Sequence, residues 1–147
     1  QGQGVAPAPG PQLLQVSAQR FIERAELRDE VFGPSSLIVR CAGVDDVLQV
    51  LDAVGGSLTV TVWGADDDTA DNRALVRGAT QIAGRVLFAG VPTGVAVTAA
   101  QQHGGPWPSS TAPMTTSVGD AALERFLRPV CLQDAPAWLL ARGGVPC

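Results

Sequence analysis

Apolar and polar positions alternate along residues 12–89 in a pattern that predicts short strands separated by helices. Apolar, β-branched runs of strand length lie at residues 12–16, 36–41, 57–63 and 85–89. Apolar positions at helical spacing lie between these runs, after Ser17 and at residues 44–54 and 69–82. Strands that alternate with helices through short connections indicate a right-handed βαβαβ unit. The pattern therefore predicts an α/β fold in which helices cover a largely parallel sheet.

Residues typical of helix ends support these boundaries. Ser17 can cap the first helix, because its hydroxyl can accept from free first-turn amides. The second helix has Asp45 and Asp46 in its first turn, and two glycines follow it. Gly84 is expected to end the third helix. The face that this helix should bury consists of Ala70, Ala74, Leu75, Ala79 and Ile82.

The last third of the chain has a different character. Residues 90–119 are rich in Gly, Pro, Ser and Thr and form too long a stretch for a plain connector, which is typical of functional or mobile loops. Residues 117–120 have capping-box spacing and predict a helix at residues 121–127. A final strand is expected at residues 129–133, and Asp134 is expected to cap a last short helix.

Composition and charge argue against several classes of protein. Apolar residues make up 46% of the 147 residues and charged residues 16%, which indicates a globular chain. The net charge is -4, and the arginines are scattered, whereas a nucleic-acid surface needs clustered positive charge. No apolar run approaches the roughly 18 residues of a membrane span. Neither nucleic acid nor membrane is therefore an expected partner.

The cysteines and the single histidine suggest little chemistry of their own. Cys41, Cys131 and Cys147 are too few and too scattered for a disulfide framework, which fits a reducing, cytoplasmic setting. Cys41 and Cys131 lie in apolar stretches, where small buried side chains are expected. No paired ligands at short spacing accompany His103, so no metal site is predicted. No glycine-rich phosphate-binding turn is present either.

The most informative segment is DEVFGP at residues 29–34, directly before a predicted strand. Taken alone, an acid, an aromatic residue and a Gly-Pro turn describe an ordinary strand entry. The segments SLTVTVWG, ATQIAGRVLFAG, QQHGGPWPSST and SVGDAALERFLRPVCLQ follow it in that order. This ordered set resembles the aldehyde dehydrogenase family over about residues 5–145. Several of its motifs are most similar to the branch that oxidises 2,5-dioxovalerate (α-ketoglutaric semialdehyde) and related aldehydes.

The resemblance implies a three-layer αβα fold: residues 1–127 would form the C-terminal part of the catalytic domain, and residues 128–147 an oligomerisation strand and tail. It also implies that Glu30 accepts hydrogen bonds from the nicotinamide ribose hydroxyls of NADP or NAD. Phe32 would pack against the nicotinamide. His103 stands where the family usually has an aromatic residue lining the aldehyde tunnel, so its role is either that of a pocket-wall or loop-stabilising residue or that of a polar contact with the substrate.

The same resemblance places the family's nucleophilic Cys, its general-base Glu and its dinucleotide-binding fold upstream of the residues present here. None of the three cysteines matches the nucleophile's motif, so no catalytic residue is expected and the chain alone should be inactive. The expected partners are the rest of an aldehyde dehydrogenase chain and, through residues 129–133, a second subunit. A free-standing, non-catalytic interaction or assembly domain of the same fold is the alternative.

Overall fold

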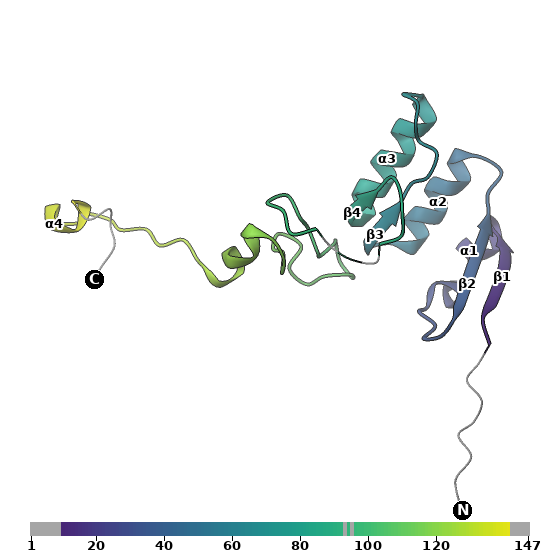
Figure 1. The fold of residues 1–147 in the computed structure, drawn as a ribbon, viewed down its shortest axis with the longest axis horizontal. Helices are drawn as coiled ribbons and strands as arrows, with labels where there is room; N and C mark the ends of the chain where they lie inside the picture. Colours follow the sequence, from purple (N-terminus) through teal and green to yellow (C-terminus); the bar gives the residue numbers. More distant parts are fainter. Residues whose placement is uncertain (1–9, 93, 95, 142–147) are drawn as a thin grey trace, which may run out of the picture.

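The computed structural model describes residues 10–92, 94 and 96–141, and its regular structure is concentrated before residue 88 (Figure 1). Strands and helices alternate along this part of the chain. In order they are β1 (Gln12–Ser17), α1 (Ala18–Glu23), the 3-10 helix η1 (Ala25–Arg28), β2 (Ser35–Arg40), α2 (Val44–Val54), β3 (Ser57–Thr61), α3 (Ala70–Ile82) and β4 (Ala83–Leu87). The α/β class and the parallel pairing of its strands are confirmed.

The strands form two separate pairs, whereas the sequence predicted one continuous sheet. β1 pairs with β2 in parallel, from Gln12 opposite Ser35 to Ser17 opposite Arg40. β3 pairs with β4, also in parallel, from Ser57 opposite Ala83. Within the described residues no strand joins the two pairs. The apolar pattern identifies each strand, but its neighbours in a sheet depend on contacts between distant parts of the chain.

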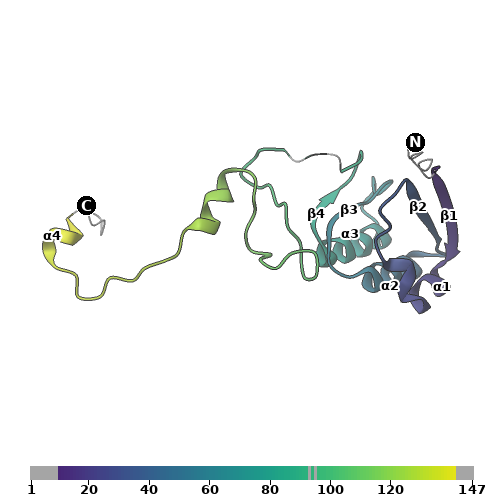
Figure 2. The ribbon, with the colours of Figure 1, turned by 90° about the horizontal axis from the view of Figure 1, so that it is seen from below.

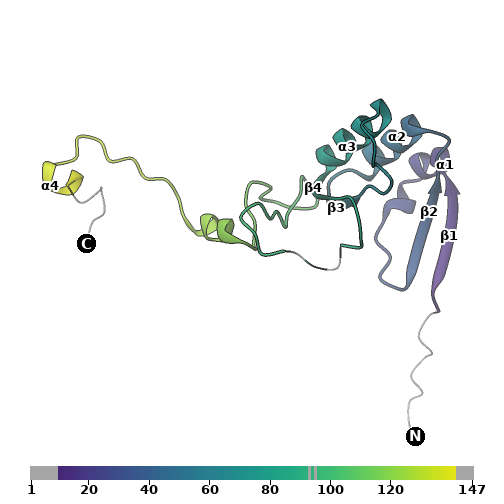
Figure 3. The same ribbon diagram turned by 45° about the horizontal axis from the view of Figure 1, so that its top comes forward.

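The helices pack beside the strand pairs and enclose a small core. α2 and α3 lie side by side (Figure 3), and α1 contacts α2, β1 and β2. Gly78 allows the close approach of α2 and α3, because a Cβ at that position would lie 2.8 Å from Leu48 Cδ2. Ala79 is fully buried as predicted, whereas Ala70, in the first turn of α3, is exposed. The described core consists of Ala18, Phe21, Ala79 and Ala83.

Local hydrogen bonds explain where the helices begin. Ser17 Oγ accepts from the Arg20 amide at 3.3 Å, which confirms the predicted cap of α1. α2 occupies its predicted range, and Gly55 follows it with a positive φ of 73°. Asp46 Oδ2 accepts from the Ala42 amide at 2.8 Å ahead of that helix.

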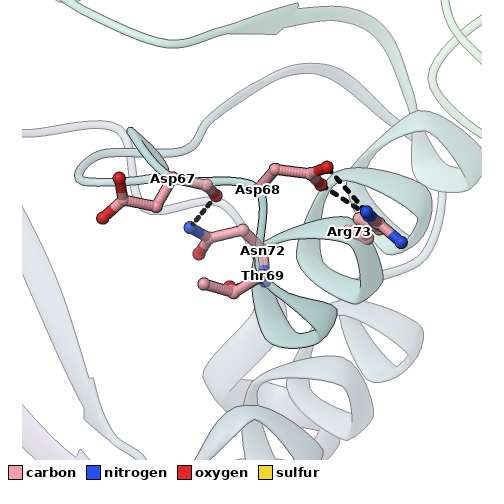
Figure 4. Close-up of polar contacts among 5 residues, drawn as sticks. All are labelled: Asp67, Asp68, Thr69, Asn72 and Arg73. Atoms are coloured by element: carbon pink, nitrogen blue, oxygen red, sulfur yellow. Dashed lines mark hydrogen bonds and ion pairs between the residues drawn. The ribbon is translucent and has the colours of Figure 1, made fainter.

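The start of α3 is held by side chains on both sides of its cap (Figure 4). Thr69 Oγ1 accepts from the Asn72 amide at 3.1 Å, and Asn72 Nδ2 donates to the Asp67 carbonyl at 2.8 Å. Arg73 binds Asp68 through two nitrogens, at 2.5 and 2.6 Å. At the other end the helix stops at Ile82 as predicted, but Gly84 does not end it, because Gly84 lies inside β4, where the backbone is already extended.

The C-terminal third departs most from the prediction (Figure 2). Residues 121–127 were expected to form an α-helix, but the structure has the 3-10 helix η2 (Asp120–Phe126), with Gly119 and not Ser117 at its cap. Residues 129–133 form no strand, because no described strand lies beside them to complete a ladder. The last helix, α4 (Ala137–Leu140), begins after Pro136, and Asp134 makes no cap bond to it.

Two further sequence expectations concern burial and membranes. Cys41 is only half-buried and Cys131 is exposed, so the prediction of two buried thiols was wrong, while Cys147 lies outside the described residues. Cys131 is exposed because residues 129–133, which contain it, form no strand and no described strand lies beside them. Across the described residues, no helix is long and apolar enough to cross a membrane.

Candidate functional site

The DEVFGP segment forms the loop between η1 and β2. Its end is fixed to the first sheet, because the Gln12 amide donates to the Pro34 carbonyl at 2.8 Å and the Ser35 amide donates to the Gly33 carbonyl at 2.8 Å. The loop is therefore anchored at the point where β1 and β2 begin.

Side chains along this loop alternate between two directions. Asp29 and Val31 line a pocket of about 250 Å³ beside the first sheet, while Glu30 and Phe32 do not contribute to it. Glu30 is exposed, and the Phe32 side chain is 91% exposed. Such alternation is typical of extended backbone. It leaves a carboxylate and an aromatic ring free to contact a ligand.

Within the described residues, the Glu30 carboxylate has no hydrogen-bond or ion-pair partner. The two ion pairs found there join Arg24 to Glu26 and Arg73 to Asp68. An unengaged carboxylate can accept from two neighbouring hydroxyls at once. The Glu30 carboxylate is therefore unengaged in the described part of the chain, with the exposed ring of Phe32 two residues away.

His103 lies on a different part of the molecule, beside the second sheet. It lines a pocket of about 280 Å³, and its Nδ1 lies 3.1 Å from Ser117 Oγ. The loop around it is held by Gln102, whose Nε2 donates to the Pro113 carbonyl at 3.1 Å and whose Oε1 accepts from the Gly104 amide at 3.0 Å. A histidine fixed in this way can form a pocket wall.

Glycines allow this loop to pack directly against β3 and β4. A Cβ at Gly84 would lie 1.8 Å from the Gly104 carbonyl oxygen, and one at Gly105 would lie 2.2 Å from the Ser57 carbonyl oxygen. A Cβ at Gly56 would likewise meet the Trp107 carbonyl oxygen at 2.3 Å. Backbone contacts of this kind tolerate no side chain. They place the His103 pocket at the start of the second strand pair.

Polar side chains dominate the lining of the His103 pocket. Leu58 contributes an apolar wall, and Arg125 of η2 is the one lining residue with a permanent charge. Six lining residues carry hydroxyls: Ser109, Ser110, Thr111, Thr115, Thr116 and Ser117. Sequence reasoning identified His103 but missed Ser117 and Arg125. The richness of residues 90–119 in Ser and Thr was the available signal, and nothing in the spacing singled out Arg125.

The structure does not bring the sequence-predicted residues into one pocket. Glu30 and Phe32 precede β2 in the first sheet, whereas His103 adjoins β3 and β4 in the second. Neither the pocket beside the DEVFGP loop nor the His103 pocket is lined by residues of both groups. They form two separate surfaces.

Cys41 lacks the surroundings of a nucleophile. Burial, followed by the Asp46 carboxylate, raises the pKa of the Cys41 thiol. A nucleophilic cysteine needs the opposite shift, toward the thiolate. The described residues also contain no group of three or more His, Cys, Asp or Glu side chains that could hold a metal ion.

Comparison with known proteins finds curated relatives, including two semialdehyde dehydrogenases. The chain is 49% identical over 134 residues, or 91% of its length, to alpha-ketoglutaric semialdehyde dehydrogenase 2 of Azospirillum brasilense. It is 40% identical over 131 residues, or 88% of its length, to alpha-ketoglutaric semialdehyde dehydrogenase of Acinetobacter baylyi. These alignments cover 26% and 25% of the relatives, so the chain spans about a quarter of their length. No family model matches the sequence.

Proposed function

The chain belongs to the aldehyde dehydrogenase family, and we propose that it supplies a cofactor-contacting loop and part of the aldehyde pocket of an NAD(P)-dependent enzyme. The proposed reaction is oxidation of 2,5-dioxovalerate, or a related aldehyde, to a carboxylate. The observation that carries the proposal is the identity of 49% over 91% of the chain to a relative named for that semialdehyde. NADP or NAD, when bound, accepts the hydride.

Glu30 and Phe32 are proposed to hold the nicotinamide riboside. Glu30 would accept from the two ribose hydroxyls, since its carboxylate has no partner among the described residues. Phe32 would lie against the nicotinamide, with its exposed ring limiting where the nicotinamide can swing. Both residues act through position, because hydride transfer depends on a well-aligned donor and acceptor. His103 is proposed to line the aldehyde pocket from the other surface.

The chain by itself is proposed to have no aldehyde-oxidising activity. Covalent catalysis by cysteine needs an activated thiolate, whereas the pKa of Cys41 is raised and Cys131 lies in a segment without regular structure. The partners proposed to complete the site are the rest of an aldehyde dehydrogenase chain and a second subunit. The large apolar side chains exposed on this chain, among them Leu13, Val31 and Trp63, support packing against such neighbours.

A direct assay tests this proposal. The chain alone and a full-length enzyme containing it are incubated with 2,5-dioxovalerate and either NADP or NAD, and absorbance of the reduced cofactor is followed. We expect turnover from the full-length enzyme and none from the chain. Turnover by the chain that persists in Cys41→Ala and Cys131→Ala variants would show that the chemistry has been assigned to the wrong residues. A full-length enzyme inactive on every aldehyde tested would overturn the proposed reaction.

A further inference from the structure

The His103 pocket has the composition of a site for an anion. Arg125 lines it, and none of the residues that line it is Asp or Glu. A positive charge with no opposing carboxylate favours an anionic ligand. The pocket volume of about 280 Å³ accommodates a short aliphatic molecule.

Arg125 has free hydrogen-bonding capacity. Its guanidinium carbon lies 5.6 Å from the centroid of the neighbouring Phe126 ring. Arg24 and Arg73 each form an ion pair with a carboxylate, but Arg125 forms none within the described part of the chain. A guanidinium can bind a carboxylate through two parallel N–H donors, which is among the strongest hydrogen-bonded arrangements in proteins.

The hydroxyls of the pocket differ in whether they can donate to a ligand. Ser109 donates to the Pro106 carbonyl at 2.6 Å, and Thr115 donates to the Ala112 carbonyl at 3.1 Å, so both are engaged. Ser110 Oγ accepts from the Ala112 amide at 3.2 Å, which leaves its own O–H free to donate. Thr111 is exposed at the same turn. Ser110 and Thr111 can therefore act with Arg125.

We propose that this pocket binds the carboxylate of a short aliphatic ligand. Arg125 pairs with the carboxylate, Ser110 and Thr111 donate hydrogen bonds to it, and Leu58 contacts the alkyl chain. Arg125 favours a carboxylate, and the apolar side chain of Leu58 favours a hydrocarbon chain. Together they select a carboxylate attached to a hydrocarbon chain over an inorganic anion. Identifying this group with the carboxylate of a semialdehyde substrate rests on the function proposed above.

Titration of the chain with glutarate tests the pocket directly. His103 is the one histidine, so its labelled imidazole gives an unambiguous NMR signal at the pocket wall. We expect glutarate to shift this signal saturably, and 1,5-pentanediol and sulfate to do so weakly or not at all. Arg125→Gln should weaken glutarate binding about tenfold or more, because a charge-assisted hydrogen bond is lost. Arg125→Lys, which keeps the charge, should retain part of the affinity.

Arg128→Gln is the matched control, because Arg128 is exposed, lies three residues further on and does not line the pocket. If Arg125→Gln and Arg128→Gln weaken glutarate binding equally, the effect is one of net charge and the proposal is overturned. Sulfate binding as tight as glutarate binding would also overturn it. Backbone NMR spectra of each variant report whether it is folded. Ser110→Ala is an independent second variant and should also weaken glutarate binding. No saturable shift of His103 with glutarate would refute the site.

The full-length enzyme separates this proposal from the proposed function. There, Arg125→Gln should raise KM for 2,5-dioxovalerate and leave KM for pentanal, which has no carboxylate, unchanged. An equal rise for both aldehydes would contradict carboxylate recognition at Arg125. If the full-length enzyme oxidises no aldehyde, the proposed function fails, and the glutarate titration still decides whether the pocket binds carboxylates.

Discussion

Glu30 and Phe32 show how a side chain can be prominent in the sequence and contribute little to the fold. Both lie on the loop anchored by Pro34 and Gly33 to the start of the first sheet, and neither lines the pocket formed in part by Asp29 and Val31. Exposed positions of this kind rarely affect stability by more than about 0.5 kcal/mol. Effects on cofactor binding and effects on folding can therefore be measured separately at these residues.

The first prediction concerns Glu30→Ala. In the full-length enzyme, we expect hydride transfer to slow by about 10- to 100-fold, because a misplaced nicotinamide loses its alignment with the substrate. In the chain itself, the free energy of unfolding in urea should change by less than about 0.5 kcal/mol. Asp29→Ala is the control and should leave hydride transfer unchanged, because Asp29 is next to Glu30 but lines the pocket beside the first sheet. A loss of several kcal/mol in the chain would instead identify Glu30 as a structural carboxylate.

A second prediction at the residue scale concerns Gly84→Ala. The new Cβ would lie 1.8 Å from the Gly104 carbonyl oxygen, and neither backbone can move without disturbing the other. We expect a loss of about 1–3 kcal/mol in urea unfolding, the usual cost of overpacking. Gly33→Ala is the control, since nothing lies within 4 Å of a Cβ there. Equal stability of the two variants would mean that the 104–109 loop does not pack against β4.

At the scale of elements, α3 combines a capped start with a buried centre. Thr69 accepts from the Asn72 amide, and Arg73 pairs with Asp68 across the first turn (Figure 4). Asp68 and Arg73 are both exposed, so that ion pair contributes little. The cap satisfies an amide that has no partner within the helix, and it should therefore contribute more.

Thr69→Ala is expected to lower the free energy of unfolding by about 1 kcal/mol, because the Asn72 amide loses its acceptor. The matched control is Thr80→Ala in the last part of the same helix, where the hydroxyl donates to the Arg77 carbonyl and caps nothing. Alanine at that site should be neutral or slightly stabilising by its helix propensity. Urea unfolding followed by circular dichroism measures both, and a neutral Thr69→Ala variant would contradict the role of the cap.

On the scale of the whole molecule, the described chain is unevenly packed. The two strand pairs, their helices and the loop that packs on β3 and β4 form one part, and the segment from η2 onward extends away from it (Figure 2). Few side chains are fully buried, while many large apolar ones are exposed. An exposed apolar surface of this extent is typical of a segment that packs against other protein.

We therefore predict that the isolated chain self-associates through its C-terminal segment. Phe126, Val130 and Leu132 are 77%, 63% and 47% exposed and should lie in the contact. Size-exclusion chromatography with light scattering, on the chain and on a form ending at Gly119, measures this. We expect dimers or larger species from the chain and a shift toward monomer on truncation. A monodisperse monomer in both cases would favour a free-standing domain.

The sequence by itself determined the elements whose stability is local. α2 has its predicted bounds because Asp46 and Gly55 act within a few residues of it, and Ser17 caps α1 as expected. The positions of β1 to β4 were also predicted to within about two residues, whereas the strand predicted at residues 129–133 does not form. These features depend on backbone hydrogen bonds and side chains close in the chain, which the order of residues specifies directly.

Only the tertiary structure decided the pairing of strands, the fate of residues 129–133 and the composition of the His103 pocket. Strands gain stability from partners distant in sequence, so an apolar run such as residues 129–133 remains irregular where no described strand lies beside it. Ser117 was expected to cap a helix but lies 3.1 Å from His103, and Arg125 lines the same pocket. These contacts bridge segments 14 or more residues apart, and no local pattern encodes which segments meet.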